Sequence, residues 1–101
     1  MPGTEGKGAL DPAALADALM QLPDWEPKGK QIVKTYAFPD FDTAVEFTNQ
    51  AAEVCRRLNH FPEIALHHKK VKVVAWTPKY QAVSELDTQF AAQLEKLYEQ
   101  S

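Results

Sequence analysis

The sequence contains a single cysteine, Cys55, and no long run of apolar residues. One cysteine cannot form a disulfide within the chain, which favours a reducing compartment. The apolar runs fall far short of the ~20 residues that span a bilayer. The first residues also lack the basic start and the apolar run of a signal peptide. These absences predict a cytoplasmic protein without a membrane partner.

Basic residues are scarce as well. The chain has 11 lysines and arginines against 14 aspartates and glutamates, which gives a formal net charge of -3. Proteins that bind the nucleic-acid backbone concentrate lysine and arginine to replace its counterions. The one basic cluster, from His67 to Lys72, is typical of a solvated hairpin tip. We therefore expect no nucleic-acid partner.

The length of the chain predicts a single domain. A chain of 101 residues can bury roughly 65% of the surface that its unfolded form exposes. Its 45% hydrophobic and 25% charged residues are those of an ordinary globular domain. The first helix signal is at Asp11. The sequence predicts a flexible leader at residues 1–10 and one domain at residues 11–101.

The domain opens with a short helix and a hairpin. Asp11, with a proline directly after it, predicts the start of a helix. That helix should end before Pro23, because the residue before a proline avoids helical angles. Residues 25–27 and 32–38 read as two strands, which residues 28 and 29 join as a hairpin.

A long amphipathic helix is predicted next, and Asp42 can cap it. Its apolar face recurs at three- and four-residue steps and comprises Ala44, Phe47, Ala51, Val54 and Leu58. Cys55 lies beside this stripe. No sequence neighbour suggests a paired base, so a small buried apolar residue is the simpler interpretation of Cys55 than a reactive thiol.

The second half of the domain repeats the pattern. A hairpin is predicted at residues 63–77, turning near His68 and Lys69. Ser84 can open a last helix. The predicted inner face of that helix is Leu86, Phe90, Leu94 and Leu97, and its predicted outer face is Glu85, Asp87, Glu95, Lys96 and Glu99. The order α-β-β-α-β-β-α predicts an α+β fold, with a four-stranded antiparallel sheet covered by helices on one face.

All three histidines, His60, His67 and His68, lie within nine residues of the chain. Adjacent strand residues point to opposite faces, so at most one of His67 and His68 can join His60 at a metal, and we expect no metal site. No serine elbow or cysteine motif indicates nucleophilic catalysis. General acid-base chemistry by His60 and Asp87 is one interpretation. The alternative is that His60 is a loop residue and that Asp87 completes a helix cap with Ser84.

A longer pattern resembles a known family. The run Asn59-His60-Phe61-Pro62-Glu63, followed at matching distances by Thr77 and by Val83-Ser84-Glu85-Leu86-Asp87, resembles the pterin-4a-carbinolamine dehydratases. Phe38-x-Asp40-Phe41 and the strand of Trp25 add to this resemblance, which extends from about Asp11 to Tyr98. It implies a four-stranded antiparallel sheet with helices on one face, a homodimer that joins sheets across chains, and a pocket for a pterin.

The family's site, as the resemblance implies it, combines a glutamate, three histidines, a proline, an aromatic residue and an aspartate. This sequence keeps His60, Pro62 and Asp87. The remaining positions hold Arg56 for the glutamate, Phe61 for the second histidine, His68 for the aromatic residue and Pro78 for the third histidine. Dehydration needs one proton placed and another removed, and neither phenylalanine nor proline has a side-chain proton to transfer. The site is therefore predicted to be dismantled, and no cofactor is expected.

Three functions follow from this interpretation. The first is a non-catalytic protein that binds a protein client. The resemblance implies it because family members double as protein-binding partners, and a divergent subgroup linked to α-carboxysomes assembles ribulose-bisphosphate carboxylase (RuBisCO). The expected client is then RuBisCO, and the expected place is the cytoplasm or the carboxysome. The second is an active 4a-hydroxytetrahydrobiopterin dehydratase that works through His60 and Asp87. The third is a pterin-binding sensor.

Overall fold

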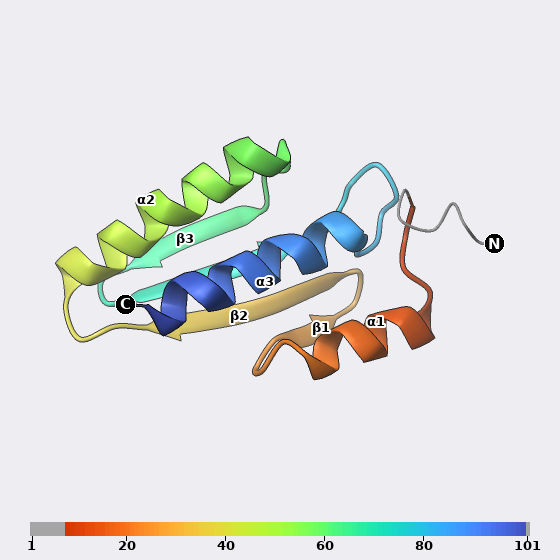
Figure 1. Cartoon of the computed structure of the whole chain (residues 1–101), viewed down its shortest axis with the longest axis horizontal. Coiled ribbons are helices and arrows are strands. Elements are labelled where there is room, and N and C mark those ends of the chain that lie inside the picture. The colour runs from red at the N-terminus through yellow and green to blue at the C-terminus, as the bar shows by residue number, and fades with distance from the viewer. Residues whose placement is uncertain (1–7, 101) are drawn as a thin grey trace.

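The structure is a computed structural model that describes residues 8–100. It contains helices at Pro12–Met20 (α1), Phe41–Leu58 (α2) and Glu85–Glu99 (α3), and strands at Glu26–Lys28 (β1), Gln31–Ala37 (β2), Glu63–His67 (β3) and Lys70–Ala75 (β4) (Figure 1). The strands form one antiparallel sheet in the order β1-β2-β4-β3. Helices α2 and α3 lie along one face of this sheet. The predicted fold class and element order are confirmed.

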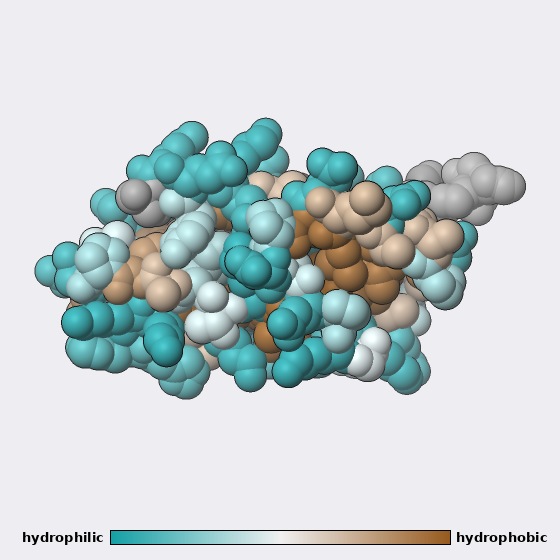
Figure 2. Space-filling model, turned by 90° about the horizontal axis from the view of Figure 1, so that it is seen from below, coloured by the Kyte–Doolittle hydropathy of each residue, from teal (hydrophilic) through white to brown (hydrophobic). Residues whose placement is uncertain are grey.

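Helix α1 begins as expected and lies on the side of the sheet where β1 is the edge strand (Figure 1). Its N-cap, Asp11, accepts a hydrogen bond from the backbone N–H of Ala14 at 2.8 Å. No residue of α1 is fully buried, and Met20 is 80% exposed. Seen from this side, apolar side chains gather over one half of the surface (Figure 2). The helix is thus only partly covered by the domain.

Residues 1–7 of the expected leader lie outside the described residues. Next to them, Ala9 forms an isolated bridge with Ser84, and the N–H of Leu10 donates to the carbonyl of Val83 at 3.0 Å. Within residues 8–100, every helix is too short or too polar to cross a bilayer.

The first hairpin differs from its prediction by one residue. Its turn consists of Gly29 and Lys30, because Lys28 already pairs with Gln31. Gly29 has a φ of 60°, a left-handed conformation that glycine adopts without a steric penalty. The prediction that Lys28 belongs to the turn was wrong, because the pairing register and the left-handed position together fix a two-residue turn.

Helix α2 is the main core helix, as predicted. Its N-cap is Asp40, whose side chain accepts from the N–H of Thr43 at 2.8 Å. The prediction of Asp42 as the cap was wrong, since Asp42 lies in the first helical turn, where it can interact only with the helix dipole. Cys55 is buried as predicted, and this burial raises the pKa of its thiol.

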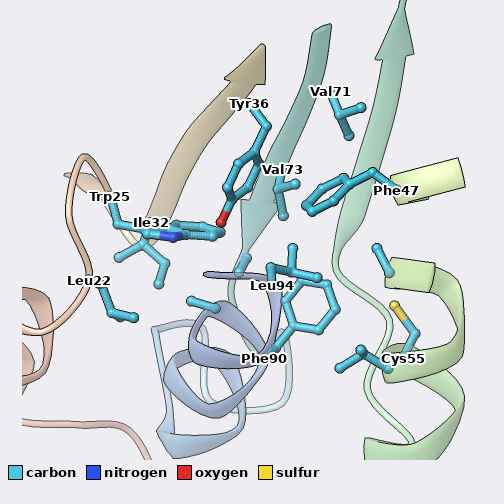
Figure 3. Close-up of a cluster of buried hydrophobic side chains, with 14 of the residues drawn as sticks. Leu22, Trp25, Ile32, Tyr36, Phe47, Cys55, Val71, Val73, Phe90 and Leu94 are labelled. Atoms are coloured by element: carbon cyan, nitrogen blue, oxygen red, sulfur yellow. The ribbon is translucent and has the colours of Figure 1, made fainter. Parts of the chain in front are cut away.

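The core lies between the sheet and helices α2 and α3 (Figure 3). Phe90 and Leu94 of α3 are completely buried, and they point toward the strands that carry Tyr36 and Val73. The ring centroids of Tyr36 and Phe47 are 4.8 Å apart, within the range of favourable aromatic pairs. The predicted inner face of the last helix is confirmed at Phe90 and Leu94.

One polar cluster lies inside this core, around Glu95. Its Oε2 atom accepts hydrogen bonds from Lys34 Nζ at 2.7 Å, from Trp25 Nε1 at 3.2 Å and from the hydroxyl of Tyr36. Lys34 also donates to the carbonyl of Pro23 at 2.9 Å. Placing Glu95 on the outer face was wrong, because these partners offset the cost of removing its charge from water. Burial, followed by the hydrogen bond to Glu95, raises the pKa of Tyr36 above its ordinary value.

Candidate functional site

The end of helix α2 turns His60 into the protein. Asn59, directly after the helix, has a left-handed φ of 53°, which asparagine tolerates better than most residues. The N–H of His60 then donates to the carbonyl of Cys55 at 3.1 Å. This cap reverses the chain, so that the His60 side chain is 8% exposed. Sequence reasoning missed the role of Asn59, although an asparagine after a periodic helix is a known end signal.

The start of helix α3 supplies the partner of His60. Asp87 Oδ1 is 2.6 Å from His60 Nε2. Asp87 Oδ2 accepts from Thr77 Oγ1 at 2.8 Å and from the backbone N–H of Ser84 at 2.9 Å. Thr77 and Ser84 are also linked to each other, hydroxyl to hydroxyl, at 2.7 Å. These four side chains form a buried network, and none of its fully buried side-chain nitrogen or oxygen atoms lacks a partner.

Asp87 has two structural roles. It completes a capping box with Ser84, as the sequence predicts, and it also binds His60. The prediction that Asp87 lies on the outer face of its helix was wrong, because Asp87 is 0% exposed. Its carboxylate is covered by the two chain segments that carry His60 and Thr77.

A cavity of about 390 Å³ opens beside His60. Its lining comprises Asn59, His60, Phe61, Pro62, Glu63, Trp76 and Pro78. Nδ1 of His60 has no hydrogen-bond partner among residues 8–100, where no buried side-chain nitrogen or oxygen lacks one. Nδ1 is therefore not fully buried, and His60 lines the cavity. The site thus has one histidine, His60, whose Nε2 is hydrogen-bonded to Asp87 and whose Nδ1 has no hydrogen-bond partner among the described residues.

The structure brings together four of the sequence-predicted site residues and separates two others. His60, Phe61, Pro62 and Pro78 line the cavity, and Asp87 lies behind His60. Arg56 does not line it: its side chain is 62% exposed and pairs with Glu53 at 3.0 Å.

His68 lies elsewhere. It occupies the turn between β3 and β4 in a left-handed conformation, with a φ of 56°. Its ring stacks on Phe41 at a centroid distance of 6.4 Å. His67 is the last residue of β3. The tip of this hairpin is therefore separate from the cavity, and neither His67 nor His68 replaces a missing histidine there.

Trp76 and Glu63 were missed as site residues. Glu63 pairs with Val74 across β3 and β4, and Trp76 follows two residues after Val74. The pairing of β3 with β4 therefore brings Trp76, the residue after β4, beside the start of β3, and both side chains line the cavity. Only the register of the hairpin reveals this, since 13 positions separate the two residues in the sequence.

The described residues limit what the site can hold. Within residues 8–100, no group of three histidine, cysteine or acidic side chains is placed to hold a metal ion. The ionisable side chains that line the cavity are His60 and Glu63. Any proton transfer in this cavity would have to pass through these two side chains or through water.

Comparisons with known proteins place this geometry in context. The family model described as pterin 4 alpha carbinolamine dehydratase matches residues 8–97. A relative from Dechloromonas aromatica, named "Putative pterin-4-alpha-carbinolamine dehydratase", is 39% identical over 98 residues, which cover 97% of this chain and 88% of the relative.

Two solved structures are similar. A transcriptional coactivator/pterin dehydratase from Brucella melitensis has a TM-score of 0.87 at 29% identity and covers 90% of this chain and 99% of its own. A pterin dehydratase-like protein described as a RuBisCO assembly factor in the alpha-carboxysome has a TM-score of 0.63 at 19% identity. It covers 74% of this chain and 89% of its own, a likeness of fold.

Proposed function

This chain belongs to the pterin 4 alpha carbinolamine dehydratase family, and from the residues of its cavity we propose that it no longer catalyses dehydration and acts by binding a protein client. The observation that carries this proposal is the composition of the cavity. Phe61 and Pro78 line it at the positions where the resemblance implies histidines, and Arg56 points elsewhere. The vestigial site positions of this proposal are the kept residues His60, Pro62 and Asp87 and the altered positions Arg56, Phe61, His68 and Pro78, of which Arg56 and His68 lie outside the cavity.

The chemistry supports the proposal. Loss of water from a carbinolamine needs a proton delivered to the departing hydroxyl and another removed from the ring. One positioned acid-base group contributes about 10²–10⁴-fold. Among the described residues that line the cavity, His60 is the buried side chain that could act as an acid or base, while the side chain of Glu63 is exposed to solvent. A site with this content accelerates the reaction little beyond its spontaneous rate.

The proposed client is RuBisCO, whose subunits expose apolar area before they assemble. The support is that another protein of this fold is described as a RuBisCO assembly factor, and that the retained fold offers a rigid surface. The proposed place is the cytoplasm or the carboxysome. Binding by a chaperone should be transient, so we expect a modest interface rather than one of obligate size.

The proposed assembly is a homodimer. The strand order leaves β1 and β3 as edges of the sheet. β1 is short and contains Pro27, which cannot donate a backbone hydrogen bond. β3 has five residues and no proline, so its edge is suited to pair with a second copy.

Co-expression tests the client. RuBisCO subunits are produced with and without this protein, and assembled enzyme is measured by native gel and by carboxylase activity. We expect more assembled enzyme when the protein is present. Equal amounts in both samples would exclude RuBisCO as the client.

A second candidate, the active dehydratase, is favoured by the His60–Asp87 pair, because a carboxylate that orients a histidine is a common catalytic arrangement. The test is the dehydration of a 4a-hydroxytetrahydropterin. We expect the background rate from the wild-type protein, from His60→Ala and from the control His67→Ala. A wild-type rate within tenfold of an intact family member, abolished only by His60→Ala, would reverse the proposal.

A further inference from the structure

The cavity beside His60 has an aromatic and proline-rich wall that no described part of the chain covers. Phe61, Pro62, Trp76 and Pro78 contribute to it, and Phe61 is 69% exposed. Large exposed aromatic side chains are uncommon on a monomer surface and are enriched where proteins bind one another. This wall offers flat apolar surfaces to a ligand.

The charge of the cavity is negative. Glu63 is exposed in its lining and has no ion-pair or hydrogen-bond partner among residues 8–100. Arg56 pairs with Glu53 instead. No lysine or arginine lines the cavity. Any charge on His60 is balanced by the buried carboxylate of Asp87, so Glu63 is the unbalanced charge.

The free carboxylate and an aromatic ring line the same cavity. The pairing of β3 with β4 brings Trp76, the residue after β4, beside the start of β3, where Glu63 lies. A ligand that enters the cavity therefore meets a flat ring and a carboxylate together. A planar cation satisfies both, since its face stacks on an aromatic ring while its edge donates to a carboxylate.

We propose that this cavity binds an arginine side chain presented by the client protein, with the guanidinium on the aromatic wall and its N–H groups on Glu63. Arginine fits better than lysine, because its planar fork matches a carboxylate and stacks on rings, whereas an ammonium is a compact, strongly hydrated charge. This inference rests on the proposed protein-binding function and names the chemistry that the site recognises.

Direct binding of short probes tests the chemistry without any client. The probes are three acetylated and amidated tripeptides, Gly-Arg-Gly, Gly-Lys-Gly and Gly-citrulline-Gly, titrated into the full chain while the indole N–H signal of Trp76 is followed by NMR. We expect the arginine probe to bind at least tenfold more tightly than the citrulline probe, which has the same shape without the charge. Equal binding of the three probes would overturn the proposal.

Variants locate the binding. Glu63→Gln should weaken the arginine probe by about tenfold or more, the loss of one charge-assisted pair, and Phe61→Ala should weaken it as well. Glu53→Gln is the control, since it removes an exposed carboxylate outside the cavity, and it should leave binding unchanged. Both glutamates and Phe61 are exposed, so these variants should fold. Tight binding of 7,8-dihydrobiopterin that the arginine probe does not displace would assign the cavity to pterins and overturn the proposal.

The co-expression assay separates this inference from the function it rests on. If wild-type protein raises the yield of RuBisCO and Glu63→Gln raises it equally, the arginine site is wrong and the chaperone function stands. If wild-type protein has no effect on RuBisCO yet binds the arginine probe through Glu63, the client is wrong and the site stands. We expect Glu63→Gln to lose most of the effect and Glu53→Gln to keep it.

Discussion

Replacing Asp87 by alanine should destabilise the domain more than any other single change at the site. The carboxylate accepts three hydrogen bonds, from His60 at 2.6 Å, from Thr77 at 2.8 Å and from the N–H of Ser84 at 2.9 Å. Thr77 keeps its link to the Ser84 hydroxyl after the change. His60 Nε2 and the Ser84 N–H lose their only partners.

The magnitude follows from these two orphaned groups. A hydrogen bond to a charged group contributes roughly 1.5–3 kcal/mol, and breaking a buried charged pair costs about 3–5 kcal/mol. The variant also avoids the free-energy cost of burying the Asp87 carboxylate, which lowers the total destabilisation. We therefore expect Asp87→Ala to lower the free energy of unfolding by roughly 3–5 kcal/mol.

Urea titration followed by far-UV circular dichroism measures this loss. Glu85→Ala is the matched control: it removes an exposed carboxylate from the same helical turn and should cost less than about 1 kcal/mol. Asp87→Asn keeps the size of the side chain and one acceptor oxygen, so its cost should lie between the two and can be measured even if the alanine variant does not fold. A cost of Asp87→Ala no larger than that of Glu85→Ala would refute the reasoning.

Three further predictions concern the core. Phe90→Ala should cost about 3–5 kcal/mol of unfolding free energy, because Phe90 is completely buried; a loss below about 1 kcal/mol in urea titration would contradict the packing of α3. The pKa of Tyr36 is raised in the folded protein, so the unfolded chain loses this proton first, near the ordinary tyrosine pKa of 10.0, and the stability that Tyr36 contributes below that pH should be lost as the pH rises further. Tyr36→Phe should show a smaller fall in stability over this alkaline range, and equal slopes for the two proteins would disprove the linkage. Finally, Cys55 should react with iodoacetamide far more slowly in the native protein than in the urea-unfolded chain, since burial raises its pKa; similar rates would mean that the thiol is accessible.

Most of the fold could be predicted because its signals are local. The apolar spacing of α2 and α3, the N-caps Asp11 and Ser84, and the hairpin turn at His68 and Lys69 each depend on residues within a few positions of one another. The errors at Asp42 and Lys28 concern boundaries, where two nearby residues of the same type are equally suited and only the backbone geometry chooses.

The larger errors have a common cause. Asp87 and Glu95 were assigned to solvent because acidic residues usually lie there. Asp87 is paired with His60, 27 positions away, and Glu95 with Lys34, 61 positions away. The periodicity of apolar residues within a helix does not indicate a polar contact between residues so far apart in the sequence. The cavity follows the same rule: His60, Phe61 and Pro62 are contiguous and could be named together, whereas Trp76 joins them only through the register of β3 and β4.

The hydrogen bonds of the Glu95 carboxylate also fix the position of helix α3 along the sheet. Sliding α3 along the sheet by one turn would move Glu95 by about 5.4 Å, farther than a hydrogen bond can reach. When the slip brings Ala91 into the place of Glu95, Lys34, Tyr36 and Trp25 lose their shared acceptor, which makes that packing costly even where its leucines and alanines would fit. Helix α3 carries Asp87 two turns earlier, so the same constraint fixes the position at which Asp87 meets His60. The alignment of the site is thus set from the centre of the domain, and the residues at its mouth are free to vary.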